Sequence, residues 1–265
     1  MTDEHLPPRA ADNSSPVTLY NEQDGALVVV RSYSDGHVIP SLCSSCNNRA
    51  SRRGLPQAYT AWRDDVVSHV NLAAATYEFQ TGGARTDLWA LQKPDGGAFV
   101  LPIEHGKDVL SKRMMNLHPG RIARQILGMT LAVQASRNLL DNHPQLAAAY
   151  SSDGPTSIEP FSLHVALADA GMNYLSSGVR SVTVDLGSGR STGIGFWMIS
   201  FPPFLMCLVD GPEAPIAATR IDQWLAYPVS AVFGRHERKV AYPIANQEEL
   251  LVAKMYADLD RMRST

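Results

Sequence analysis

The chain has 265 residues, of which 45% are hydrophobic and 18% are charged, and its formal net charge is −3. This composition excludes an intrinsically disordered chain, because the apolar residues are sufficient to bury a sizeable core. The slightly acidic balance also excludes a global electrostatic attraction to nucleic acid, so binding of DNA or RNA would require a local basic patch.

The first third of the chain alternates loop, strand and helix signals. Residues 1–16 are rich in Pro, Asn and Ser, and this composition predicts an irregular loop. A β-rich run at 27–30, a turn at Asp35-Gly36 and a short strand at 38–39 predict a hairpin. Apolar residues then recur at helical spacing, which predicts a helix from Gln57 to about Phe79.

The middle of the chain predicts a second hairpin, a second helix and a linker. Strands at 88–90 and 98–103 flank a Pro-Asp-Gly-Gly turn. Helical periodicity follows over residues 120–140, with Pro119 at its N-terminal boundary. The basic residues around this helix, Arg121 and Arg124 among them, are expected to form a solvated face. Residues 144–160 are rich in Pro, Ser, Asp and Gly and are the best linker candidate.

The last part of the chain is predicted to contain mainly strands. They are expected at 161–168, 179–186, 195–209, 229–233 and 239–244, before a closing helix at 247–262. Hairpins and a few long helices without regular strand–helix alternation favour an α+β fold with an antiparallel sheet over a doubly wound sheet. We expect a small module over residues 1–56 and an α+β domain over residues 57–265.

Cysteine usage and hydropathy indicate a compartment. Three cysteines, two of them in a Cys-x-x-Cys pair, suit a reducing environment better than a disulfide framework. No charged and apolar leader opens the chain, and the most apolar run, residues 194–209, is interrupted by two prolines and is short for a membrane span. We therefore expect a cytoplasmic protein that is not inserted in a membrane. The sequence leaves the oligomeric state open.

The most specific motif is Cys43-Ser44-Ser45-Cys46-Asn47. Two cysteines at this spacing between a hairpin and a helix are typical of half a zinc site, which normally has four ligands. Two reduced thiols on a turn, or a redox pair, stay as alternatives, although the βαβ setting of a thioredoxin-like motif is not predicted. If the pair binds zinc, its sulfurs should face one another on a tight turn before the helix at Gln57. Cys207 lies in an apolar run and is expected to be a buried, inert thiol.

Glu4-His5-Leu6-Pro7-Pro8, followed by the Cys-x-x-Cys-Asn motif, resembles the HNH (His-Me finger) superfamily, in particular the branch seen in phage junction-resolving endonucleases. In that family an acidic residue and a His end the first strand of a treble-clef-like module. The resemblance implies that Glu4 and Asn47 bind a catalytic Mg²⁺ or Mn²⁺ ion, that His5 activates water, and that Cys43 and Cys46 bind structural zinc.

The first zinc knuckle of that family would lie before Glu4 and is not found in the sequence. Two explanations stay open: the sequence begins after that knuckle, or this member has lost its zinc. With an incomplete zinc site, residues 1–16 are expected to be poorly packed unless His5 approaches Asn47. The chain is also similar to a bacterial family without an established activity, through residues 39–47, 122–127 and 200–204.

A basic segment follows the cysteine motif. Arg49, Arg52 and Arg53 are candidate phosphate contacts for DNA or RNA, although a solvated loop is an equal alternative. Tyr59 and Trp62 lie on the apolar stripe of the next helix and are expected in the core. The leading hypothesis is a metal-dependent phosphodiesterase of HNH ancestry, and an inactive descendant stays as an alternative. The alternatives are a non-catalytic binding module that uses the finger remnant as a scaffold, and an unrelated enzyme built on the second domain.

Overall fold

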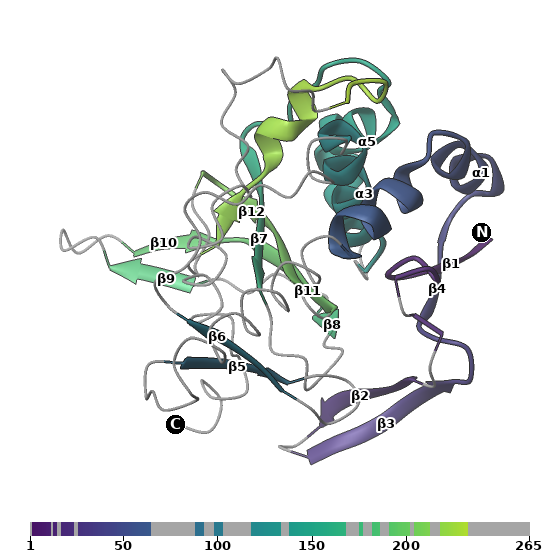
Figure 1. Cartoon of the computed structure of the whole chain (residues 1–265). Helices are drawn as coiled ribbons and strands as arrows, with labels where there is room; N and C mark the ends of the chain where they lie inside the picture. Colours follow the sequence, from purple (N-terminus) through teal and green to yellow (C-terminus); the bar gives the residue numbers. More distant parts are fainter. Residues whose placement is uncertain are drawn as a thin grey trace.

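The computed structural model describes residues 2–11, 13–14, 17–23, 26–64, 88–92, 98–102, 118–133, 138–167, 175–176, 182–185, 191–201, 204–212 and 218–232. Within these ranges the chain forms helices and antiparallel sheets, so the predicted α+β class is confirmed at this level (Figure 1). The helices are α1 (Ser44–Arg52), a helical segment at 55–64, α3 (Pro119–Ala132), α4 (Asn138–Asn142), α5 (Pro144–Ser151) and the 3-10 helix η2 (Asp222–Ala226).

The described strands form one five-stranded sheet and four two-stranded ones. The large sheet has the order β13-β7-β12-β11-β8, and the small sheets pair β1 with β4, β2 with β3, β5 with β6, and β9 with β10. The strand bounds are β1 Thr2–His5, β2 Val17–Gln23, β3 Ala26–Tyr33, β4 Val38–Leu42, β5 Leu88–Gln92, β6 Ala98–Pro102, β7 Phe161–Leu167, β8 Leu175–Ser176, β9 Val182–Asp185, β10 Ser191–Ile194, β11 Phe196–Phe201, β12 Phe204–Asp210 and β13 Thr219–Arg220.

The large sheet is built around β12, which pairs with β7 on one side and with β11 on the other. Phe204 lies opposite Leu167 of β7 and opposite Phe201 of β11. The run predicted as one strand over 195–209 is therefore two strands, β11 and β12. The two prolines at which a bend was predicted lie between these strands in the sequence and outside the described residues.

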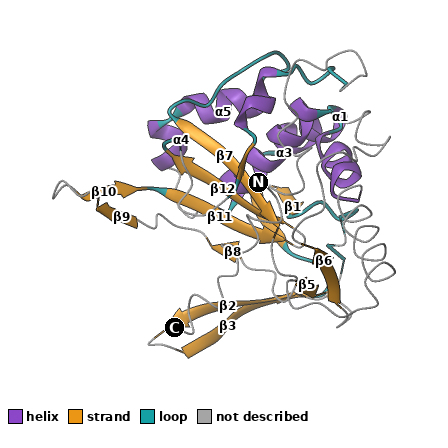
Figure 2. Ribbon diagram, turned by 60° about the vertical axis from the view of Figure 1, so that its left-hand side comes forward, coloured by secondary structure: helices purple, strands orange, loops and turns teal. Residues whose placement is uncertain are grey.

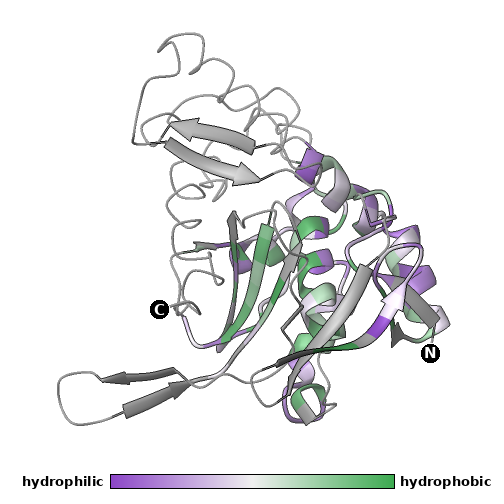
Figure 3. Ribbon diagram, turned by 90° about the horizontal axis from the view of Figure 1, so that it is seen from below, coloured by the Kyte–Doolittle hydropathy of each residue, from purple (hydrophilic) through white to green (hydrophobic). Residues whose placement is uncertain are grey.

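One face of this sheet packs against the helices (Figure 2). Alternate residues of a strand point to opposite faces, and one alternate set from β7, β11 and β12 belongs to the main buried cluster. It consists of Phe161, Leu163, Val165, Trp197, Ile199, Phe204, Met206 and Leu208. Ile122 and Ile126 of α3 are fully buried in the same cluster. Figure 3 shows the hydrophobic colouring concentrated in these central strands and the adjoining helix.

Trp62 connects the helix at 55–64 to the sheet. Its indole is fully buried and stacks on Phe204 of β12, with ring centroids 4.1 Å apart and an interplanar angle of 6°. A second, edge-on contact joins it to Trp224 of η2 at 6.2 Å. Leu6, from the predicted N-terminal module, belongs to the same buried cluster. Residues on both sides of the predicted domain boundary at residue 56 thus share one core.

Three local expectations are wrong. Residues 2–5 form strand β1 and Leu6 is fully buried, because pairing with the distant β4 overrides the loop-like composition of the segment. The strands β3 and β4 do not pair with each other, since β3 pairs with β2 and β4 with β1. The predicted linker at 144–160 contains helix α5, which begins at Pro144 in the position that best tolerates proline.

Several other expectations can be compared with the structure. The hairpin of β5 and β6, the helix start at Pro119 and the strand β7 are confirmed. Residues 229–230 form a turn and residues 231–232 have no regular secondary structure, so the predicted strand is not formed there. The predicted elements at 239–244 and 247–262, and the part of the first long helix beyond residue 64, lie outside the described residues.

None of the helices in the described part of the chain combines the length and the apolar character needed to span a bilayer.

Candidate functional site at the start of helix α1

The strands β1 and β4 and the helix α1 form a continuous unit near the N-terminus (Figure 1). The two strands are antiparallel, with His5 opposite Val38 and Thr2 opposite Leu42. His5 is the last residue of β1, and α1 begins two residues after the end of β4. Helix α1 contacts both strands. The unit thus has the order strand, inserted hairpin, strand and helix.

Asn13 joins the two ends of the insertion between β1 and β4. Its side-chain Nδ2 donates to the carbonyl oxygens of Pro7, at 2.7 Å, and His37, at 2.9 Å. Its Oδ1 accepts from the backbone N–H of His37 at 2.6 Å. Gly36, with φ +84°, passes so close to Asn13 that a Cβ atom there would overlap the Asn13 backbone. Position 36 therefore requires glycine, and its contact with Asn13 holds the backbone in place just before β4 begins.

His37 belongs to the same buried junction and has a structural role. Its backbone oxygen accepts from the N–H of Leu6 at 3.1 Å, and its Nδ1 lies 3.3 Å from the Leu6 oxygen. Burial lowers the pKa of His37, and the hydrogen bond to Leu6 opposes this shift. The imidazole is therefore held neutral over a wider pH range than an exposed histidine.

Cys43 and Cys46 lie at the N-terminus of α1 with their sulfur atoms 2.8 Å apart. Cys43 is the N-cap residue, and its Sγ accepts from the backbone N–H of Cys46 at 3.2 Å. Both side chains are exposed. The prediction that the sulfurs face one another is confirmed. The helix that they precede is α1, a helix that the sequence pattern did not predict.

Hydrogen bonds make the two thiols unequal. The pKa of Cys43 falls to about 7, first because of the side-chain hydrogen bond with Cys46 and then because of those with Ser45 Oγ and the Cys46 N–H. The pKa of Cys46 rises, mainly because its hydrogen bond with Cys43 favours the protonated form of this thiol. Cys43 is the more acidic sulfur of the pair and the better nucleophile near neutral pH.

The described residues do not complete a tetrahedral zinc site around this pair. Two thiolates on one zinc ion, with Zn–S bonds of about 2.3 Å, lie about 3.8 Å apart, whereas these sulfurs are 2.8 Å apart. Over the described ranges, no group of three or more His, Cys, Asp or Glu side chains is arranged to hold a metal ion. Zinc binding by Cys43 and Cys46 stays a prediction.

The other predicted site residues lie in the same unit. Glu4 pairs with Ile39 in the β1–β4 ladder. Asn47 lies in the first turn of α1, where its backbone N–H donates to the Cys43 oxygen at 3.0 Å, and its side chain is partly buried. The Nδ1 atom of the partly buried His5 is shielded from solvent and makes no hydrogen bond within the described part of the chain.

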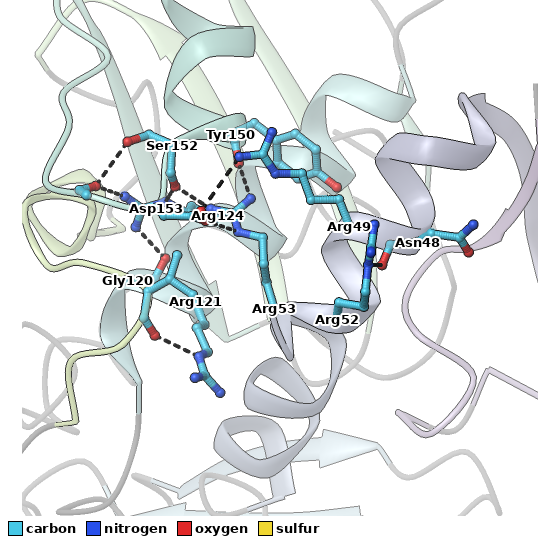
Figure 4. Close-up of polar contacts among 12 residues, drawn as sticks. Asn48, Arg49, Arg52, Arg53, Gly120, Arg121, Arg124, Tyr150, Ser152 and Asp153 are labelled. Atoms are coloured by element: carbon cyan, nitrogen blue, oxygen red, sulfur yellow. Dashed lines mark hydrogen bonds and ion pairs between the residues drawn. The ribbon is translucent and has the colours of Figure 1, made fainter.

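The predicted basic residues have different surroundings (Figure 4). Arg53 turns toward the start of the loop after α5: it donates to the oxygens of Tyr150, at 2.9 Å, and Ser152, and its Nε lies 2.7 Å from Asp153 Oδ1. Arg49 is half-exposed and lies 3.6 Å from the same carboxylate. Arg52 is exposed and bonds only to its own helix among the contacts described here, through Asn48 O at 3.3 Å. Arg49 and Arg52 are thus the accessible cations of this segment.

Arg124 of α3 is a buried cation that the sequence analysis assigned to a solvated face, and that expectation is wrong. Its side chain is fully buried and its guanidinium donates only to backbone oxygens in the bonds described here. The acceptors are Ser152 at 2.9 Å, Gly120 at 2.8 Å, Tyr227 at 3.0 Å, Gly154, and Leu225 at 3.5 Å. Burial is the main cause that lowers its pKa to about 10. The guanidinium stays charged at neutral pH and fixes the loops after α5 and η2 to α3.

The buried position of Arg124 has one signal in the sequence, its place among Ile122, Ala123 and Ile126. The structure adds a second sign that Arg124 is buried here. A Cβ atom at Gly120 would lie 2.9 Å from an Arg124 nitrogen and would overlap the Tyr227 oxygen.

Comparison of the chain with known protein families, with curated proteins and with solved structures found no match in any of the three. The site's own geometry is therefore the basis for a functional assignment.

Proposed function

We propose that the chain is a metal-dependent nucleic-acid phosphodiesterase of HNH (His-Me finger) ancestry, with a treble-clef-like remnant formed by β1, β4 and α1. The observation that carries the proposal is the order of this unit: His5 ends the first strand, the second strand leads into α1, and Asn47 lies in the first turn of that helix. The resemblance to the family implies this order for a catalytic base and a metal ligand.

The side chains offer suitable chemistry for phosphodiester hydrolysis. Glu4 and Asn47 would hold a Mg²⁺ or Mn²⁺ ion through a carboxylate and an amide oxygen, the ligand type that hard divalent cations prefer. Such an ion, when bound, offsets negative charge on the scissile phosphate. His5, partly exposed at the end of β1, would accept the proton of the attacking water.

Arg49 and Arg52 are the proposed phosphate contacts. Both project from α1, the helix that contributes Asn47, and both are exposed. Neutralisation of backbone phosphates by arginine gives affinity that is independent of sequence and that falls as salt rises. Arg53 is a weaker candidate for this role, because its donors are directed at Tyr150, Ser152 and Asp153.

The proposal is tested by cleavage assays on single-stranded, double-stranded and branched DNA and on RNA, with Mg²⁺ or Mn²⁺. His5→Ala should lower the cleavage rate by about 100-fold or more, since a positioned general base contributes at least that factor. Asn47→Ala should also abolish metal-dependent cleavage. Asn48→Ala is the matched control, because this exposed neighbour is the same residue type on the same helix.

Two results would contradict the proposal. One is equal cleavage by the parent protein, His5→Ala and Asn47→Ala, with thermal melting showing that all three are folded. The other is inactivity of the parent protein on every substrate and with both metals. Inactivity combined with salt-dependent binding of DNA or RNA that Arg49→Ala and Arg52→Ala weaken would favour a non-catalytic binding module built on the same scaffold.

A further inference from the structure

The two sulfur atoms at the start of α1 are positioned for bond formation. They are 2.8 Å apart, so an approach of about 0.8 Å would bring them to the length of a disulfide bond. The backbone bond from Asn47 N–H to the Cys43 oxygen, 3.0 Å long, closes the helical turn between them. The spacing is thus maintained by the backbone of α1.

The surroundings assign different roles to the two sulfurs. Cys43 Sγ accepts the N–H of Cys46 at 3.2 Å and lies 2.9 Å from Ser45 Oγ, so donors surround the sulfur at the positive end of the helix. Cys43 is exposed, which allows a small reactant to approach it. Cys46 follows one turn later with its sulfur directed at Cys43. This is an attacking sulfur followed by a resolving sulfur.

We propose that Cys43 and Cys46 form a redox-active dithiol that low-molecular-weight aliphatic disulfides oxidise to an intramolecular disulfide. The local setting favours this chemistry, because β4 leads directly into a helix whose N-cap is the first cysteine of the pair. The proposal is independent of phosphodiester hydrolysis and uses neither His5 nor Glu4.

The exchange proceeds in two balanced steps. The Cys43 thiolate attacks one sulfur of the small disulfide RSSR, forms a mixed disulfide and releases RS⁻, which takes up a proton. The Cys46 thiol then loses its proton and attacks Cys43 Sγ, forming the Cys43–Cys46 bond and releasing the second RS⁻. Two electrons pass from the protein to RSSR, which leaves as two thiols. Cys207 takes no part, because it is buried in β12.

The test uses the full chain and glutathione as the probe. The protein is equilibrated without oxygen in mixtures of reduced and oxidised glutathione, alkylated and analysed by mass spectrometry of peptides. We expect a Cys43–Cys46 disulfide, with Cys207 reduced, in the parent protein. Cys46→Ser should accumulate a mixed disulfide of glutathione at Cys43, because this variant has no second thiol to displace the glutathione. Cys207→Ala is the control that should behave like the parent.

Three outcomes would overturn the proposal. The first is the absence of a Cys43–Cys46 disulfide at every ratio of reduced to oxidised glutathione. The second is the absence of a mixed disulfide at Cys43 in the Cys46→Ser variant. The third is purified protein that contains stoichiometric zinc and resists oxidation until a chelator removes the metal, since that result would identify the pair as metal ligands. None of these readouts depends on cleavage of nucleic acid, so failure of one proposal is distinguishable from failure of the other.

Discussion

The start of α1 and the middle of β12 give cysteine thiols opposite environments. Cys43 is exposed at a helix N-terminus, where hydrogen bonds lower its pKa to about 7. Cys207 lies opposite His164 in the β7–β12 ladder, and burial raises its pKa to about 12. The same side chain is therefore a nucleophile in one region and an inert packing group in the other, as expected when the local field and solvent access determine thiol reactivity.

The two regions also differ in how their cations are held. Arg49 and Arg52 of α1 are exposed and make long or local contacts. Arg124 of α3 is fully buried, and backbone oxygens from two loops surround its guanidinium. Among the described residues, α1 thus carries exposed thiols and cations, whereas α3 packs against the large sheet. Four substitution experiments test this division.

The largest expected effect is that of Trp62→Ala, at the contact between the helix at 55–64 and β12. Loss of a buried indole that stacks on Phe204 should lower the free energy of unfolding by about 3 to 5 kcal/mol. Urea denaturation followed by circular dichroism measures this change. Gln57→Ala, at an exposed position of the same helix, should change it by less than about 0.5 kcal/mol. A loss below about 1 kcal/mol for Trp62→Ala would show that the helix is not part of the main core.

Arg124→Met is expected to have the next largest effect. The methionine fills a similar space but removes the guanidinium hydrogen bonds to the carbonyl oxygens of both loops, so the free energy of unfolding should fall by about 3 to 4 kcal/mol. Arg52→Met, an exposed arginine, is the matched control and should stay within about 0.5 kcal/mol of the parent. If urea denaturation gave the same loss of unfolding free energy for both substitutions, the buried arginine would contribute no more to stability than the exposed one.

Because of His164, the free energy of unfolding is expected to depend on pH. Its ring nitrogen Nε2 lies 2.8 Å from Ser162 Oγ, and burial is the main cause that lowers its pKa from 6.5 to about 4. Between these values the unfolded chain binds a proton that the folded chain does not, so stability falls as the pH drops from about 6.5 to about 4. The contribution of this group over the whole window is about 3 kcal/mol.

His164→Gln should therefore lose less stability than the parent when urea denaturation is repeated at steps between pH 7 and pH 4. Ile199→Val, a mildly destabilised variant that retains the histidine, should keep the parent's pH dependence. His37, whose pKa burial also lowers, contributes equally to all three proteins. Identical slopes for His164→Gln and the parent would show that folding does not shift the pKa of His164.

The smallest effects concern the two arginines that share Asp153. Arg53, whose side chain is 9% exposed, lies 2.7 Å from the carboxylate, whereas Arg49, 52% exposed, lies 3.6 Å away. Arg53→Ala should cost about 2 kcal/mol, because buried backbone oxygens also lose a donor. Arg49→Ala should cost less than about 0.5 kcal/mol, as exposed ion pairs do. Thermal unfolding of both variants in low and high salt measures the difference, and the reverse order would contradict the assigned burial.

Sequence patterns predicted those elements that depend on local periodicity. The start of α3 at Pro119, the strand β7 and the β5–β6 hairpin follow from proline placement, β propensity and a Pro-Asp-Gly-Gly turn. Trp62 was expected in the core from its position on an apolar stripe, and it is fully buried. These signals lie within a few residues of the element that they predict.

Long-range pairing was not predictable in the same way. Strand β1 forms because β4, more than thirty residues later, supplies its hydrogen-bonding partner. Arg124 was misassigned because an isolated arginine gives no indication of the backbone oxygens, far along the chain, that surround it. At the candidate site, the Cys-x-x-Cys spacing predicted facing sulfurs. Helix α1 itself is short and polar, and it offers no hydrophobic periodicity to detect.

The hydrogen bonds of Asn13 have a consequence for the evolution of the N-terminal unit. Because Asn13 and His37 bring the ends of the insertion together, the entropic cost of closing this loop is offset at its base. Further lengthening of the insertion would add only about 0.6 kcal/mol for each doubling of its length. The β2–β3 hairpin can therefore be lengthened or shortened while β1, β4 and α1 keep their register. Asn13 in this way makes the segment between β1 and β4 a place where added residues cost the fold little.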